Sequence, residues 1–240
     1  ISPYPEIAPF ISTIRGQHQE LKKTSELRRE FTANVSHELK TPLTSISGIA
    51  EIMQSGMVKP EDIQGFAADI YQEAQRLIAL VEDIIRLSQL DEGAIDLERK
   101  SINLLTLAQE VGRRLDPAAQ KAGITLKVMG LSVSVYGIPS VLDEMVYNLC
   151  DNAIKYNHPG GTVNVTVAPS PNGAELTVED TGIGIPVEDQ SRVFERFYRV
   201  DKSHSKEIGG TGLGLSIVKH GASLHGAQIH MDSQVGRGTS

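Results

Sequence analysis

Apolar residues recur every three or four positions through most of the first third of the chain. They mark one stripe from about residue 14 to residue 56 and a second from residue 63 to residue 87. This spacing is typical of an amphipathic helix. The stripes consist of Phe31, Val35, Leu39, Leu43, Ile46, Ile49 and Met53, and of Ile63, Phe66, Ile70, Ala74, Leu77, Val81, Ile84 and Leu87. With Ser55-Gly56 and Pro60 between the stripes, the pattern predicts two long helices joined by a short turn.

Two such helices form an antiparallel hairpin, and a single hairpin covers its own apolar stripes poorly. Pairing two copies into a four-helix bundle buries both stripes. We therefore expect a homodimer.

The pattern changes after Asp91-Glu92-Gly93. Short segments at 124–128, 162–167 and 175–179 alternate apolar and polar residues, as strands do, and residues 169–173 are typical of a hairpin turn. Helical stretches at 104–121 and 139–156 lie between them, the second with Pro in its first turn. The chain is therefore predicted to be α+β: a helical hairpin followed, from near residue 93, by an α/β domain with a mixed sheet.

Composition narrows the function. A formal net charge of −7, without a basic cluster, argues against nucleic acid as a partner of this segment. The single cysteine, Cys150, leaves no disulfide and no thiolate-rich metal site, and it fits a reducing compartment. No stretch approaches the roughly 20 apolar residues of a membrane helix. Because the chain starts at Ile1 and stops where a strand is predicted to begin, we expect it to be a piece of a longer protein.

Two glycine-rich segments indicate a phosphate ligand. Residues 180–185 directly follow a predicted strand, and residues 209–215 open a predicted helix that runs to about residue 224. Glycine allows the backbone to approach a ligand closely, and a helix N-terminus offers N–H groups to phosphates. Either segment alone is equally well explained as a turn. Neither is a P-loop, and the first does not fit the dinucleotide fingerprint.

A polar helix face adds to this signal. Asn148 and Asn152 are four residues apart, so they share a face of the 139–156 helix, and Lys155 follows one turn later. An amide oxygen suits Mg²⁺, and a lysine suits a phosphate. Asp180, at a strand end, can accept a hydrogen bond from the amine of adenine, where guanine presents a carbonyl. Without the glycine segments, a solvated polar face would be the better explanation.

Together these segments resemble the ATP-binding domain of bacterial two-component sensor histidine kinases of class I, a domain type shared with gyrase, Hsp90 and MutL. The N box of that family matches residues 148–156, its G1 box 180–184, its F box 194–199 and its G2 box 210–215, and residues 200–209 match its lid. The resemblance implies an α/β sandwich that binds ATP and Mg²⁺, with Asn152 on the metal, Asp180 on adenine and Arg199 toward the γ-phosphate. The nucleotide-binding residues that it implies are Asn148, Asn152, Lys155, Tyr156, Asp180, Gly182, Gly184, Gly210, Thr211, Gly212, Leu213 and Gly214.

His37 is the candidate phosphoacceptor. It lies two residues from both Val35 and Leu39, so it points away from the apolar stripe and into solvent. An exposed imidazole is mostly neutral near pH 7 and offers a nucleophilic lone pair. Glu38 can accept a hydrogen bond from the other ring nitrogen, and Pro42 should kink the helix.

A lone exposed histidine usually has no function. Here, however, residues 31–44 resemble the H box of the same family. By this resemblance His37 is phosphorylated, and Thr41 positions water for removing phosphate from the aspartate of the partner.

The resemblance covers residues 28–240 and implies a protein-histidine kinase that phosphorylates His37 and passes the phosphoryl group to a response-regulator receiver domain. We expect a helical connector (1–23), a dimerisation and phosphotransfer hairpin (24–93) and a C-terminally truncated catalytic domain (94–240) that swings on a linker at 91–101. The segment would be the cytoplasmic part of a membrane-anchored bacterial sensor. Two alternatives remain: an ATPase whose cycle drives a conformational change, and a scaffold without catalysis.

Overall fold

The computed structural model describes residues 8–91, 98–171, 173–200 and 210–240. The chain divides into two compact units between Leu80 and Val81. The first unit contains the hairpin except for the last turns of its second helix. Those turns, together with the strands and the other helices, form the second unit.

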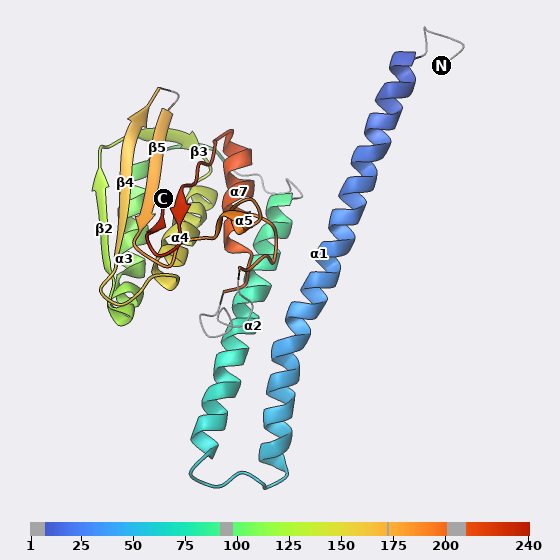
Figure 1. The fold of residues 1–240 in the computed structure, drawn as a ribbon, viewed down its shortest axis with the longest axis vertical. Helices are drawn as coiled ribbons and strands as arrows, with labels where there is room; N and C mark the ends of the chain where they lie inside the picture. Colours follow the sequence, from blue (N-terminus) through green and yellow to red (C-terminus); the bar gives the residue numbers. More distant parts are fainter. Residues whose placement is uncertain (1–7, 92–97, 172, 201–209) are drawn as a thin grey trace. The chain divides into compact units, whose positions relative to one another are not determined.

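The first unit confirms the predicted hairpin. Helix α1 (Ala8–Gln54) and helix α2 (Ile63–Asp91) run antiparallel and are joined by residues 55–62 (Figure 1). Helix α1 begins within the predicted helical connector and continues through Pro42. Because proline has no N–H, the carbonyl of Glu38 has no hydrogen-bond partner at that position of the helix.

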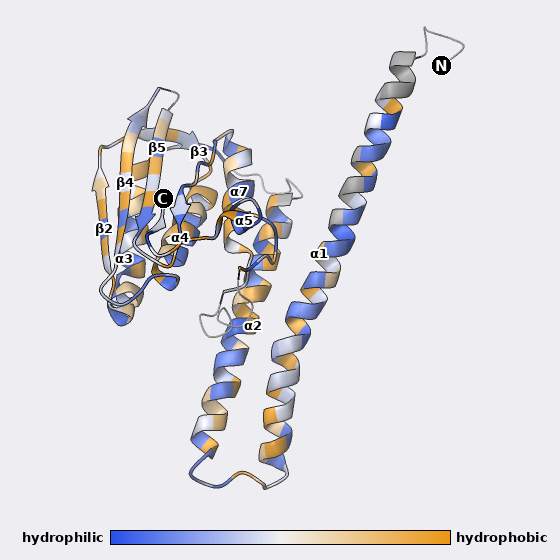
Figure 2. Cartoon of the chain, viewed as in Figure 1, coloured by the Kyte–Doolittle hydropathy of each residue, from blue (hydrophilic) through white to orange (hydrophobic). Residues whose placement is uncertain are grey.

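The apolar stripes are only partly covered within one hairpin. Phe31, Val35 and Leu39 of α1 are half-buried. Leu43 and Ile78, by contrast, remain 52% and 50% exposed. Figure 2 shows apolar positions distributed along both helices. A single hairpin thus leaves apolar surface in solvent, as predicted for helices that need a further partner.

The second unit is an α/β domain with a mixed sheet, as predicted. In its main sheet β2 lies parallel to β4, and β4 lies antiparallel to β5. Two further antiparallel pairs are β1 with β3 and β6 with β7. The strands are β1 (Lys100–Asn103), β2 (Thr125–Gly130), β3 (Ser134–Gly137), β4 (Thr162–Ser170), β5 (Gly173–Asp180), β6 (Ser233–Gln234) and β7 (Gly238–Thr239). The described helices of this unit, besides the end of α2, are α3 (Leu104–Ala122), α4 (Pro139–Lys155), α5 (Val187–Gln190) and α7 (Gly214–His225).

The core lies between the main sheet and helices α3 and α4, which cover one of its faces (Figure 1). Alternate residues of β4 point into this layer, and Val163, Val165 and Val167 are fully buried, whereas Thr166 between them is exposed. On α3 the buried side chains follow the helical period, as Leu107, Val111 and Leu115 do. The result is a two-layer sandwich.

Helices α4 and α7, which carry much of the candidate site, are tied to each other. A Cβ at Gly221 of α7 would lie 2.6 Å from the sulfur of Met145 on α4, so glycine allows the close packing. His225 fixes one end of the pair, because its Nε2 accepts the N–H of Ile138 at 2.9 Å. The Nδ1 atom lies 2.8 Å from the Gly221 carbonyl and must carry the proton, since Nε2 accepts. The neutral ring therefore connects the start of α4 to the end of α7.

Most predicted elements are confirmed, and the missed ones are short. The register pairs Ser170 of β4 with Gly173 of β5, which confirms the predicted hairpin. The strands β1 and β3, the one-turn helix α5 and the two-residue β6 were not predicted. Segments of four residues or fewer carry too little of either period to be recognised. Among the described helices, none combines the length and apolarity that crossing a membrane requires.

The predicted hinge and domain boundary fall near the end of α2. Residues 92–97 of the predicted 91–101 linker lie outside the described residues. The compact units divide earlier, after Leu80, because side chains of the last turns of α2 pack within the second unit. Leu87 there is fully buried and Leu90 is 5% exposed. The predicted boundary near residue 93, between the hairpin domain and the catalytic domain, therefore stays a prediction.

Candidate functional site

Helix α4 presents the predicted asparagine face. It begins at Pro139, whose fixed φ suits a first turn, and ends at Lys155. Asn148 donates a hydrogen bond through Nδ2 to the Glu144 carbonyl at 2.9 Å, which directs its oxygen outward from the helix. Asn152 is half-buried one turn later, and no side-chain hydrogen bond is found for it among the described residues. Its amide is therefore available to a ligand.

Lys155 has a carboxylate partner, which was not predicted from the sequence. Its ammonium lies 2.6 Å from the carboxylate of Asp151, one turn earlier on α4. The lysine side chain remains 36% exposed. An ammonium held by one carboxylate at the edge of a site still has donors for a phosphate oxygen.

The G1 segment lies against the end of α4. The N–H of Ile183 donates to the Tyr156 carbonyl at 3.0 Å. A Cβ at Gly182 would lie 2.3 Å from that same carbonyl oxygen, so only glycine fits there. Gly184 has φ +68, in the region that glycine adopts readily. The end of the N box and the G1 loop thus share one backbone junction.

Asp180 closes this junction from the end of β5. Its Oδ1 accepts the N–H of Gly182 at 2.7 Å. Burial raises the pKa of Asp180, and backbone hydrogen bonds from Gly182 and Thr239 partly oppose the rise. A half-buried carboxyl held by backbone N–H groups is rigid, which is what recognition of one exocyclic amine needs.

The G2 segment also packs against the polar face of this helix. A Cβ at Gly214 would lie 2.7 Å from the side-chain oxygen of Asn148, and one at Gly210 would lie 3.1 Å from the Tyr156 hydroxyl. Gly214 is the first residue of α7, whose N-terminus has no side-chain cap. Leu213, just before it, is fully buried and anchors the loop. The three predicted segments therefore converge around the polar face of α4.

The F box is linked to the G2 loop. Phe197 has φ 64, uncommon for a bulky residue, and its N–H donates to the Gly212 carbonyl at 2.8 Å. Gly212 has φ +74, and a Cβ there would lie 2.9 Å from the Phe197 Cα. Arg199 is half-buried two residues later. Most of the predicted lid, residues 201–209, lies outside the described residues.

The phosphoacceptor segment belongs to the first unit, on α1. The His37 side chain is 80% exposed, as predicted from its position off the apolar stripe. Its Nδ1 lies 3.7 Å from the Glu38 carboxylate, too far for a hydrogen bond but close enough for one after a small rotation. The Thr41 hydroxyl donates to the His37 carbonyl at 3.2 Å. His37, Glu38 and Thr41 therefore cluster on one exposed part of the helix.

Asp83 was missed in the sequence analysis and contacts the site directly. The Thr211 hydroxyl donates to its carboxylate at 2.6 Å. One signal was present in the sequence, because Asp83 interrupts the helical spacing of Leu80, Leu87 and Leu90. A carboxylate within a buried leucine row is rare unless it has a partner.

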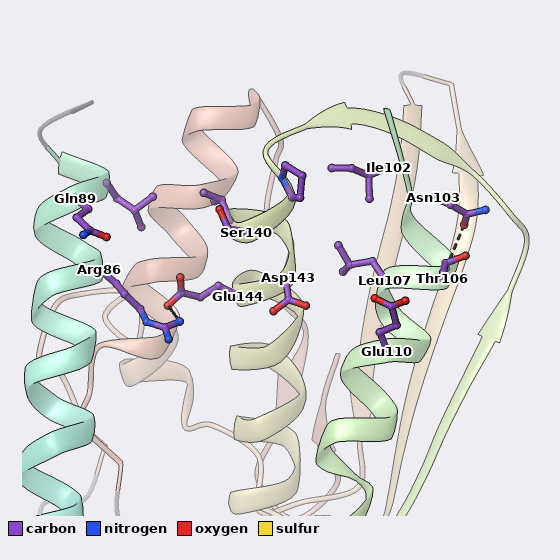
Figure 3. A pocket seen from close by; sticks show the side chains of 13 residues that line it. Arg86, Gln89, Ile102, Asn103, Thr106, Leu107, Glu110, Ser140, Asp143 and Glu144 are labelled. Carbon is purple, nitrogen blue, oxygen red and sulfur yellow. Dashed lines mark hydrogen bonds and ion pairs between the residues drawn. The ribbon is translucent and has the colours of Figure 1, made fainter. Parts of the chain in front are cut away.

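A cavity of about 700 Å³ lies elsewhere in the second unit (Figure 3). It is lined by the end of α2, by β1 and α3, and by the first turns of α4, and none of the predicted nucleotide-binding residues lines it. The convergence of the glycine loops, rather than this cavity, marks the candidate nucleotide site. Within the described part of the chain, no cluster of three His, Cys, Asp or Glu residues could hold a metal ion. A metal at Asn152 would therefore depend on oxygen atoms from a ligand or from water.

Two family models match the chain. "His Kinase A (phospho-acceptor) domain" matches residues 27–93. "Histidine kinase-, DNA gyrase B-, and HSP90-like ATPase" matches residues 137–240. The first match contains His37, and the second contains the asparagine face and both glycine loops.

Curated relatives agree with these matches. The chain is 37% identical to "Sensor-like histidine kinase SenX3" of Mycolicibacterium smegmatis over 228 residues, which is 94% of this chain and 58% of that protein. It is 33% identical to "Sensor protein kinase WalK" of Staphylococcus aureus over 224 residues, 92% of this chain and 54% of that protein. The chain thus spans about half the length of these relatives.

Solved structures share the fold. The histidine kinase ThkA in complex with the response regulator TrrA matches with a TM-score of 0.73 at 21% identity, over 100% of this chain and 66% of that one. The kinase AdeS of Acinetobacter baumannii matches with a TM-score of 0.69 at 24% identity, over 85% of this chain and 94% of that one. Full-length ShkA in complex with AMPPNP matches with a TM-score of 0.62 at 26% identity, over 88% of this chain and 44% of that one.

Proposed function

Because this chain belongs to the sensor histidine kinase family, we propose that it uses ATP and Mg²⁺ to phosphorylate its own His37 and then transfers the phosphoryl group to an aspartate of a response-regulator receiver domain. The observation that carries the proposal is the convergence of the N box, G1 and G2 segments on one face of α4. The exposed His37 within the matched phosphoacceptor domain supplies the acceptor.

The nucleotide site fits ATP by its chemistry. Glycines at 182, 212 and 214 let the G1 and G2 loops pack directly against α4 and the F box, because a Cβ at each would lie within 3 Å of protein atoms. Asp180 would accept the adenine amine, and the uncapped N-terminus of α7 would face phosphates. The remaining predicted ligands are Asn148, Tyr156, Gly184, Gly210, Thr211 and Leu213. The structure of ShkA with AMPPNP supports a nucleoside triphosphate as the ligand of this domain type.

Charge neutralisation and positioning would supply most of the catalysis. Lys155 and Arg199 would stabilise charge on the phosphates, and the Asn152 amide oxygen would hold Mg²⁺, whose role is to neutralise phosphate oxygens. His37 would attack the γ-phosphorus through one ring nitrogen. Glu38, 3.7 Å away, would hold the proton of the other nitrogen and stabilise the cation that forms.

The partners follow from the family. The hairpin would pair with a second copy of itself, covering apolar residues such as Leu43 and Ile78. The receiver would bind the exposed faces of the hairpin near His37, where Thr41 would also assist dephosphorylation of the receiver. The parent protein would be a membrane-anchored sensor, with this segment in the cytoplasm.

Labelling with γ-³²P-ATP and Mg²⁺ tests the proposal. We expect label on the protein that is stable in alkali and lost in acid, and that is absent from His37→Ala. His18→Ala is the matched control, because His18 is another exposed histidine of α1, and it should label normally. Phosphate release without protein-bound label would favour the ATPase alternative, and neither activity would favour the scaffold.

A further inference from the structure

One face of the last turns of α2 is buried within the second unit. Leu87 and Leu90 on this face are 0% and 5% exposed. Asp83 occupies the same face, four residues before Leu87, so it lies in the same packed region. Burial removes part of the hydration of the Asp83 carboxylate and thereby raises its pKa.

Asp83 binds a residue that the proposed function assigns to ATP. Its carboxylate accepts the Thr211 hydroxyl at 2.6 Å. Lys155 adds an electrostatic attraction to the charged form of Asp83, although its own ion pair is with Asp151. A carboxylate oxygen and a phosphate oxygen are both anionic acceptors, so either can accept the Thr211 hydroxyl. The single hydroxyl proton cannot be donated fully to both at once.

Two further contacts hold the end of α2 in place. Arg86 donates to the Glu144 carboxylate at 3.0 Å, and Figure 3 shows this pair at the edge of the cavity. A ring nitrogen of His220 lies 2.9 Å from the Leu90 carbonyl. The cavity beside the pair lies between α2, α3 and α4, so this part of the packing is open. Contacts of this kind can separate without unfolding either helix.

We propose that Asp83 competes with the phosphates of the nucleotide for the Thr211 hydroxyl, so that the end of α2 acts as an internal inhibitor of ATP binding. The proposal rests on the proposed function, because it takes Thr211 as a phosphate ligand. Nucleotide binding displaces the carboxylate and weakens the docking of α2. By reciprocity, docking of α2 lowers the affinity for nucleotide by the same factor by which bound nucleotide weakens the docking.

Removing the carboxylate tests the competition. We expect Asp83→Ala to bind AMPPNP with Mg²⁺ at least about fivefold more tightly than the parent chain, as measured by calorimetry. Glu82→Ala removes the same charge from the neighbouring exposed position and should change the dissociation constant less than about twofold, because exposed charges are screened. Equal affinity of Asp83→Ala and the parent chain would overturn the proposal.

The Arg86–Glu144 pair gives an independent test that leaves the nucleotide ligands intact. Arg86→Glu places two carboxylates together and should undock α2, which raises the affinity for AMPPNP although it adds negative charge. Combining Arg86→Glu with Glu144→Arg restores an ion pair with the two charges exchanged. This double variant should bind AMPPNP with the affinity of the parent chain. The inference is contradicted if Arg86→Glu binds AMPPNP more weakly than the parent chain. It is also contradicted if the double variant keeps the raised affinity of Arg86→Glu.

The two failures are distinguishable. If AMPPNP with Mg²⁺ binds neither the parent chain nor any variant while circular dichroism shows all of them folded, the proposed function itself fails. If AMPPNP binds the parent chain and all variants equally, the nucleotide site stands and the inhibitory role of Asp83 is wrong.

Discussion

Cys150 lies in the core beside the asparagine face and reports on the stability of the second unit. It is 1% exposed, and burial raises the pKa of its thiol from 9.0 to about 12. We predict that it reacts with Ellman's reagent at pH 8 only through opening of the domain, far more slowly than in urea. Prompt reaction in the native chain would show that this core is loosely packed.

The same thiol predicts an alkaline loss of stability. Its raised pKa favours the folded state up to pH 9, and this contribution decreases between pH 9 and about 12, as the unfolded chain releases the proton first. Near pH 10 to 11 the free energy of unfolding should fall more steeply in the parent chain than in Cys150→Ala, by about 1.4 kcal/mol per pH unit. Identical slopes in urea titrations of the two proteins would rule out this effect.

Thr41 offers a separate prediction at the phosphoacceptor. We expect Thr41→Ala to label at His37 normally but to lower dephosphorylation of the partner receiver at least about tenfold, because a water molecule loses its positioning group. Thr44→Ala is the matched control, since its hydroxyl makes the same type of bond, to the Lys40 carbonyl at 2.8 Å. Equal loss of dephosphorylation in both variants would assign the effect to the helix rather than to Thr41.

At the level of elements, the G1 loop requires glycine where it meets the end of α4. A methyl group at Gly182 would clash with the Tyr156 carbonyl oxygen, and that carbonyl also accepts the N–H of Ile183. We predict that Gly182→Ala lowers the stability of the second unit by about 1–3 kcal/mol and weakens nucleotide binding at least about tenfold. Thermal unfolding and AMPPNP calorimetry measure the two effects.

Gly65 is the control for that substitution. It lies in α2 with nothing within 4 Å of the Cβ position. Gly65→Ala should stabilise the helix by about 0.5–1 kcal/mol, without any effect on nucleotide binding. If Gly182→Ala behaves like Gly65→Ala, the predicted contact between G1 loop and N box does not constrain the site.

At the level of the whole molecule, a paired hairpin allows phosphorylation within one subunit or between two. Mixing His37→Ala subunits with Asn152→Ala subunits distinguishes these routes. The first variant retains the nucleotide site and the second retains the acceptor, so labelling returns in the mixture only if phosphoryl transfer crosses between subunits. An unlabelled mixture, with exchange of subunits verified by a tag, would indicate transfer within one subunit.

The sequence by itself determined the long helices and strands, in which many residues repeat the same apolar and polar period. The stripe of α1 placed His37 at an exposed position because every residue of a helix has a fixed angle to its neighbours. The glycines of the G1 and G2 segments and the asparagines of α4 were found because each group lies close together in the sequence. Short strands such as β1 and β3 were missed, since four residues hold too little pattern.

The tertiary structure decided which distant residues share a surface. It placed Thr211 on the carboxylate of Asp83, 128 residues away in sequence, and Glu144 on Arg86. No local pattern assigns Thr211 to Asp83, because the hydroxyl that donates to its carboxylate comes from another element. Periodicity reports which face of a helix is buried, whereas the chemistry that a buried charge meets depends on what folds against that face.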